Sequence, residues 1–98
     1  MTDLRDVTAN HRFEQGFTDE GGTLRTVHAD YRTHGDTRAI LHVEADPALR
    51  GKGAAGQFMQ SLANHARREK IRLDPHCSYA VAWFRRHPEA GDVLVSSD

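Results

Sequence analysis

A run of small residues between positions 50 and 56 has the composition of an anion-binding loop. It reads Arg50, Gly51, Lys52, Gly53, Ala54, Ala55 and Gly56. The apolar periodicity that follows predicts a helix, and the amide N–H groups in the first turn of a helix have no partner inside it. These groups attract anions, and small residues let a phosphate approach the backbone. With the charges of Arg50 and Lys52, the loop predicts a phosphate or pyrophosphate ligand.

Two known phosphate-binding patterns can be compared with this loop. A P-loop requires Gly-Lys-Ser/Thr, and it is excluded because Lys52 is followed by Gly53. The dinucleotide pattern G-x-G-x-x-G is present at Gly51, Gly53 and Gly56, and Asp74 lies about where a ribose-binding acid would follow. In that pattern the loop follows its strand almost at once, whereas residues 45–50 intervene here. This difference weakens the match, and a nicotinamide dinucleotide is kept only as an alternative ligand.

Nucleophilic and basic side chains lie on both sides of the loop. Cys77 follows a short predicted strand and precedes a predicted helix, whose dipole would lower the pKa of the thiol. His42 and Glu44 lie in the strand before the loop, and either could act as a general base. Two interpretations of Cys77 stay open: a nucleophile activated by His42 or His76, or a small buried apolar side chain.

The first half of the chain consists of predicted strands. They cover His11–Phe17, Thr23–Arg32 and Thr37–Glu44, separated by glycine-bearing turns. Such short connections predict an antiparallel meander. In the third strand, strict alternation places Ala39, Leu41 and Val43 on one face and Ile40, His42 and Glu44 on the other.

The second half changes period after Pro47. Apolar residues recur every three or four positions, which predicts a helix over Gly53–Glu69. Ile71–Leu73 predicts a short strand, and a helix between two strands is typical of a crossover to a parallel strand. Ser78 is expected to cap a second helix over Tyr79–Arg86. The tail after Gly91 is expected to add an edge strand or to fray.

The segment Arg50–Ala55 resembles the acetyl-CoA loop of the GCN5-related N-acetyltransferases, whose pattern is Gln/Arg-x-x-Gly-x-Gly/Ala. The resemblance covers nearly the whole chain. It includes His42 and Glu44 in the preceding strand, Cys77-Ser78-Tyr79 and Arg86-His87-Pro88-Glu89, in the order found in a subgroup of short members of that family. The resemblance implies one α/β (α+β) acetyl-CoA-binding domain over residues 1–98. Its minimal acyl-CoA N-acyltransferase fold would have an antiparallel meander, a crossover helix, a short parallel strand and a C-terminal helix.

The resemblance also implies a cofactor site. Backbone groups of Val43, Glu44 and Ala45 would run beside the pantetheine arm of acetyl-CoA, and Arg50–Ala55 would hold its pyrophosphate. Tyr79 is expected beside the cofactor, where its hydroxyl or that of Ser78 can protonate the leaving thiolate.

The implied function is transfer of acetyl from acetyl-CoA to an amine of a protein or a small molecule. Transfer is either direct, with His42 or Glu44 as the base, or through Cys77. A CoA-binding module without turnover is the alternative function. The acceptor amine is not indicated by any motif.

Composition narrows the possible partners. Thirteen Lys and Arg oppose fourteen Asp and Glu, so no strong field attracts nucleic acid or an acidic membrane. A nucleic-acid or protein-interaction domain would rest only on the basic residues between Arg50 and Arg72. The single cysteine favours the cytoplasm, and no apolar run approaches the roughly 20 residues of a membrane span. The histidine spacing predicts no metal site. We expect a monomer or a weak homodimer.

Overall fold

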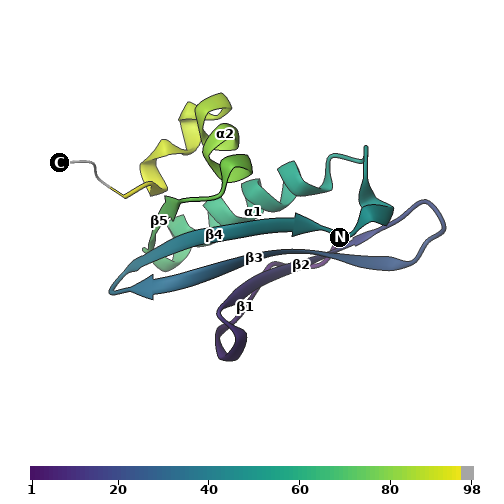
Figure 1. Ribbon diagram of the computed structural model, residues 1–98, viewed down its shortest axis with the longest axis horizontal. Coiled ribbons are helices and arrows are strands. Elements are labelled where there is room, and N and C mark those ends of the chain that lie inside the picture. Colours follow the sequence, from purple (N-terminus) through teal and green to yellow (C-terminus); the bar gives the residue numbers. More distant parts are fainter. Residues whose placement is uncertain (96–98) are drawn as a thin grey trace.

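The computed structural model describes residues 1–95, which form a five-stranded sheet with two α-helices and three 3-10 helices (Figure 1). The strands are β1 (Arg5–Val7), β2 (Arg12–Thr18), β3 (Leu24–His34), β4 (Thr37–Ala45) and β5 (Arg72–Pro75). The helices are η1 (Thr8–Asn10), η2 (Pro47–Leu49), α1 (Ala54–Glu69), α2 (Ser78–Arg86) and η3 (Pro88–Val93).

The sheet order is β1-β2-β3-β4-β5. The first four strands pair antiparallel, and β5 pairs parallel to β4 after the α1 crossover. This arrangement confirms the predicted meander, crossover helix, short parallel strand and second helix. The sequence did not predict β1, because three residues are too few to show an alternating pattern.

The core lies between the sheet and the two α-helices, and α1 passes behind β4 in Figure 1. Phe13, Val27 and Ile40 from the sheet are fully buried, as are Phe58 and Leu62 from α1. Burial of each large apolar side chain contributes about 1.5–3 kcal/mol, so the apolar stripe of α1 holds the helix on the sheet. Within residues 1–95, no helix is both long and apolar enough to cross a membrane.

A β-bulge interrupts β4. Asp30 pairs with His42 and Tyr31 pairs with Ile40, so Leu41 has no partner in β3. A bulge inserts one residue and changes the alternation beyond it. The predicted alternation is therefore wrong: Ile40 is fully buried, Leu41 is 40% exposed, and Val43 packs against the core.

Two further predictions are corrected at the end of the chain. Ser78 is the first residue of α2, and the cap is Cys77, whose backbone is extended and whose side chain makes no capping hydrogen bond. The tail neither frays after Gly91 nor adds a full strand. η3 continues to Val93, Leu94 forms an isolated parallel bridge with Leu73, and the Val95 amide donates to Leu73 O at 2.9 Å. Residues 96–98 of the predicted tail lie outside the described residues.

Candidate functional site

The edge of β4 beyond Ile40 is open. β5 pairs with β4 only from Thr37 to Ile40. The amides of His76 and Cys77 then both donate to Ile40 O, at 2.9 and 3.2 Å, and β5 ends. Over residues 41–45, no strand of the described chain pairs with β4 on the side away from β3. Apart from the Val43 amide, which donates to the Cys77 sulfur, the backbone donors and acceptors on this edge have no partner strand and are open to a ligand.

The orientation of the β4 backbone follows from its pairing with β3. The Asp46 amide donates to Thr26 O at 3.1 Å, so Asp46 faces β3. Successive residues of a strand direct their backbone groups to opposite sides. Glu44 therefore directs its N–H and C=O to β3, whereas Val43 and Ala45 direct theirs to the open edge. Of the three positions expected beside the pantetheine arm, two present backbone groups there.

Cys77 lies at this open edge, and three backbone amides point at its sulfur. Partial burial raises the pKa of the Cys77 thiol, but hydrogen bonds from the N–H groups of Ala80, Val43 and Tyr79 lower it, and the net pKa is below the ordinary value. The amides come from both β4 and the first turn of α2, whose N–H groups lack intrahelical partners. A lower pKa increases the fraction of thiolate, which is the reactive form.

The loop after β4 exposes its backbone. Asp46 Oδ1 accepts a hydrogen bond from the Ala48 amide at 2.8 Å and holds the start of η2. Gly51 and Gly53 have φ of +79° and +72°, in the left-handed region that favours glycine. A Cβ at either glycine would meet no atom within 4 Å. The space beside the loop is therefore open to a ligand.

The first turn of α1 supplies unpaired amides at the end of this loop. Gln57 is the first residue whose amide donates to the start of the helix, to Gly53 O at 3.1 Å. The amides of Gly53, Ala54, Ala55 and Gly56 have no backbone acceptor in residues 1–95. Such a turn binds anions, so the residues present fit a pyrophosphate.

Two basic side chains flank the amides. Arg50 is exposed and forms no ion pair with any residue that the structure describes. Lys52 Nζ lies 3.9 Å from Glu20 Oε1, and this carboxylate is largely exposed. An exposed pair at this distance is weak, so both cations can turn to a phosphate.

α2 brings two polar side-chain ends to the first turn of α1. A Cβ at Gly56 would lie 3.9 Å from both Tyr79 Oη and Trp83 Nε1. Burial raises the pKa of Tyr79, in part offset by Arg86, so the hydroxyl stays protonated and can donate. Trp83 follows Tyr79 by four residues, and this spacing places both side chains on one face of α2.

The predicted base lies on the sheet face opposite α1. His42 Nε2 is 3.2 Å from Glu44 Oε1, and both side chains are more than half exposed. A second pair joins His76 Nε2 to Asp74 Oδ2 at 2.9 Å. A carboxylate partner orients the imidazole ring by accepting a hydrogen bond from one of its nitrogens. Among the hydrogen bonds of residues 1–95, none joins Cys77 to either histidine.

Comparison with known proteins agrees with this geometry. Residues 12–93 match the family of GCN5-related N-acetyl-transferases. The fold is similar to the NMR solution structure of a GCN5-like protein from Staphylococcus aureus, with a TM-score of 0.65 and 22% sequence identity, over 100% of this chain and 94% of that chain. No curated protein matches the chain. An open β4 edge that leads to an amide-lined loop, in a chain whose residues 12–93 match the family, identifies the protein as a member of the GCN5-related N-acetyltransferases.

Proposed function

We propose that this protein transfers the acetyl group of acetyl-CoA to an amine acceptor. Membership of the family supports acetyltransferase activity in general. One observation supports the specific site. The unpaired edge of β4 begins beside the Cys77 sulfur, which accepts hydrogen bonds from backbone amides, and leads to the unpaired amides in the first turn of α1. A cytoplasmic location remains a prediction from the single cysteine.

The proposed cofactor contacts follow the open backbone. The Val43 carbonyl and the backbone N–H and C=O of Ala45 would form hydrogen bonds with the pantetheine arm, and the amides of Gly53 and Ala54 would hold the pyrophosphate. Acetyl-CoA supplies an acetyl group activated as a thioester. Tyr79 Oη, beside Gly56, lies at the boundary between the loop and α2, where it can contact the bound cofactor.

In direct transfer, the protein moves two protons. His42 or Glu44 takes a proton from the acceptor ammonium, and the amine nitrogen then forms a C–N bond to the acetyl carbonyl as the thioester C–S bond breaks. The Tyr79 or Ser78 hydroxyl gives a proton to the leaving thiolate, and the second proton of the nitrogen, lost as the amide forms, returns to that hydroxyl. The products are an acetylated amine and a free thiol.

In covalent transfer, Cys77 accepts the acetyl group first. Its thiolate forms a C–S bond to the acetyl carbon as the thioester C–S bond breaks, and the amine then takes the acetyl group and regenerates the thiolate. The proton of the amine goes to His42 or His76. The three amides at the sulfur support this route, because they lower the pKa of the nucleophile.

Titration calorimetry with acetyl-CoA, with NADH as the comparison ligand, tests the cofactor. The variant Gly53→Glu adds bulk and negative charge at the loop, and we expect it to abolish binding. Gly35→Glu is the matched control, because Gly35 also has positive φ, +60°, and open space around it but lies in the β3–β4 turn. Failure of the folded protein to bind acetyl-CoA would contradict the proposal, and tighter binding of NADH would favour the dinucleotide alternative.

Two substitutions test the chemistry. Cys77→Ala and His42→Gln should keep acetyl-CoA binding, and transfer through Cys77 predicts that Cys77→Ala loses turnover. Mass spectrometry after incubation with acetyl-CoA should then find an acetyl group on Cys77 of the protein without substitutions. If the protein binds acetyl-CoA but acetylates no member of a panel of protein and small-molecule amines, it is a CoA-binding module without turnover.

A further inference from the structure

Gln15 occupies a core position of β2. Phe13, Gln15 and Phe17 face α1 in alternation and are 0%, 3% and 5% exposed. The Gln15 Nε2 amide donates to Thr2 O at 2.8 Å. Its Oε1 atom is buried and has no hydrogen-bond partner in residues 1–95. Such an unpaired acceptor reduces stability, so an apolar side chain would be expected here if the position served packing alone.

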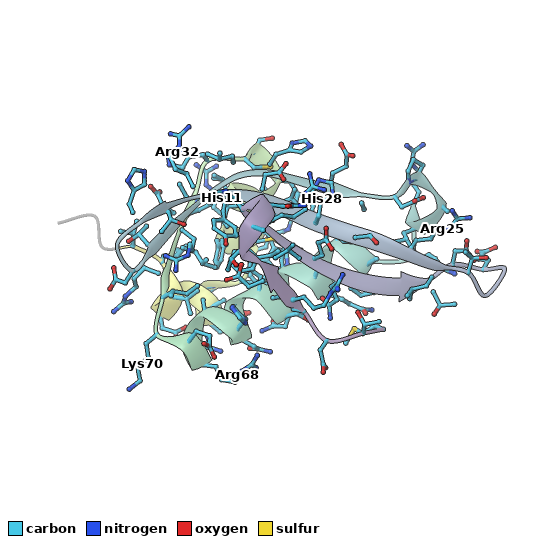
Figure 2. All side chains as sticks on the ribbon, turned by 90° about the horizontal axis from the view of Figure 1, so that it is seen from below. His11, Arg25, His28, Arg32, Arg68 and Lys70 are labelled. Atoms are coloured by element: carbon cyan, nitrogen blue, oxygen red, sulfur yellow. The ribbon has the colours of Figure 1, made fainter. Side chains whose placement is uncertain are left out.

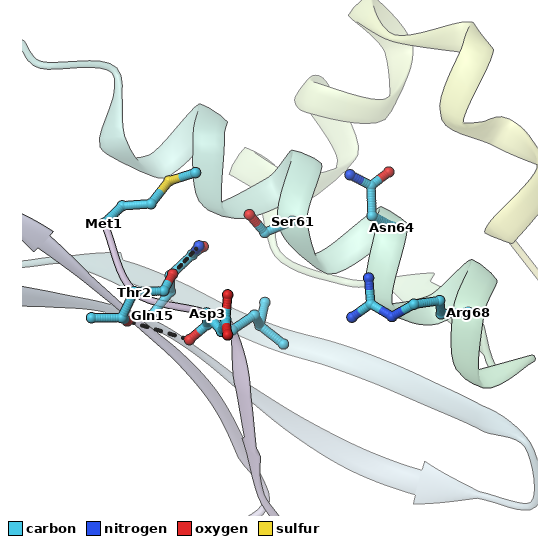
Figure 3. A pocket seen from close by; sticks show the side chains of 8 residues that line it. Met1, Thr2, Asp3, Gln15, Ser61, Asn64 and Arg68 are labelled. Carbon is cyan, nitrogen blue, oxygen red and sulfur yellow. Dashed lines mark hydrogen bonds between the residues drawn. The ribbon is translucent and has the colours of Figure 1, made fainter.

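The Gln15 side chain lines a pocket of about 630 Å³. One wall is the N-terminal segment, residues 1–4, and the other is the polar face of α1 with Ser61, Asn64 and Arg68 (Figure 3). The Arg68 side chain extends from α1 toward Asp3 across the pocket (Figure 3). Neither charged group has an ion-pair partner within 4.0 Å among the described residues. The pocket therefore offers a cation on one wall and an anion on the other.

This pocket is separate from the proposed acetyl-CoA site. It lies beside β2 and the N-terminal segment, whereas the open edge belongs to β4. Strands in a sheet are about 4.8 Å apart, which places β2 about 10 Å from β4, with β3 between them. None of the loop residues 50–56 lines the pocket. Arg68 lies near the C-terminal end of α1, far from the loop at its N-terminal end (Figure 2).

We propose that this pocket binds a small zwitterion, such as a free amino acid or a short peptide. Arg68 would bind the carboxylate, with Asn64 as a further donor. Asp3 and Gln15 Oε1 would accept hydrogen bonds from the ammonium group. Opposite charges on facing walls favour a ligand with both charges over a singly charged ligand.

Binding must also move the N-terminal segment, because Gln15 Oε1 is buried. The segment is held by the Thr2 amide, which donates to Gly16 O at 2.9 Å, and by Thr2 Oγ1, which accepts from the Gly16 amide at 2.8 Å. A ligand that reaches the oxygen shifts this segment. The backbone amide signals of Thr2 and Gly16 should then change together with those of Ser61 and Asn64.

The test is an NMR titration of the full chain with L-alanyl-L-alanine, without CoA. Two matched probes each remove one charge: N-acetyl-alanyl-alanine lacks the ammonium group, and alanyl-alanine amide lacks the carboxylate. We expect the zwitterion to bind at least about tenfold more tightly than either probe, since each loses one charge-assisted hydrogen bond. Equal binding of the three, or no change at the pocket signals, would overturn the proposal.

Substitutions assign the contacts. Arg68→Ala should abolish the preference for the dipeptide over its amide, and Asp3→Asn should abolish the preference over the N-acetyl probe. Arg85→Ala is the control, because Arg85 is an exposed arginine of α2 that forms no ion pair within the described residues and does not line the pocket. Gln15→Met should weaken the binding of the dipeptide, also by about tenfold. If Gln15→Met fails to fold, the two exposed substitutions still decide, and unchanged preferences in both would refute the site.

Discussion

Replacing Gly56 with alanine should separate protein stability from cofactor binding. Gly56 is the third residue of α1, and its φ is not in the left-handed region. Glycine in a helix is less stable than alanine by about 0.5–1 kcal/mol. The alanine Cβ would lie 3.9 Å from both Tyr79 Oη and Trp83 Nε1, which is an ordinary contact distance. Since no clash offsets the gain, Gly56→Ala should stabilise the protein.

The expected magnitudes follow from this geometry. For a domain of this size, 1 kcal/mol changes Tm by about 4–8 °C, so Gly56→Ala should raise Tm by about 2–8 °C. The same methyl group would face Tyr79 and Trp83 on the first turn of α1, whose unpaired amides we propose as the pyrophosphate site. Loss of one charge-assisted hydrogen bond costs about 1.5–3 kcal/mol, and acetyl-CoA binding should weaken at least about tenfold.

Urea unfolding and titration calorimetry measure the two effects. The urea midpoint should rise with an unchanged slope, because the surface exposed on unfolding does not change. Gly91→Ala is the control: Gly91 also avoids positive φ, and a Cβ there would meet no atom within 4 Å, but it lies in η3. Its acetyl-CoA affinity should not change. A destabilised Gly56→Ala protein, or one that binds acetyl-CoA normally, would refute the reasoning.

Three further predictions concern pH. Because backbone amides depress the pKa of Cys77, the alkylation of Cys77 by iodoacetamide should reach half its maximal rate at a pH below the ordinary thiol pKa, and a midpoint at the ordinary pKa would contradict this. The free energy of unfolding of the unsubstituted protein, relative to that of Cys77→Ser, should rise with pH up to the ordinary thiol pKa. Burial and the hydrogen bond to Asp6 raise the pKa of Tyr31 to about 12, so its stability contribution should persist below about pH 10 and be lost as pH rises through about 12, a loss that unfolding of Tyr31→Phe should not show. Burial lowers the pKa of His65, so stability should fall as pH falls below about 6.5, and a His65→Gln protein with the same pH slope would exclude this cause.

Local patterns in the sequence were sufficient for much of this fold. The three-to-four-residue spacing from Phe58 to Ala66 predicted α1 to within one residue, because helix burial depends on a single face. The glycine loop was also readable, since Gly51 and Gly53 adopt the positive φ that other residues avoid. Short strands such as β1 carried too few residues for a pattern, and the extended backbone of Cys77 moved the cap of α2 by one residue from Ser78.

The sequence by itself determined the two α-helices, the strands β2 to β5 and the glycine loop, because these depend on neighbours within a few positions. Only the tertiary structure decided where β4 loses its partner and which amides reach the Cys77 sulfur, since both depend on strand register. Register also placed the bulge at Leu41, which returned Val43 to the core face. Burial of Gln15 beneath α1 was equally invisible in sequence, because strand alternation identifies two faces but does not show which polar side chain packing encloses.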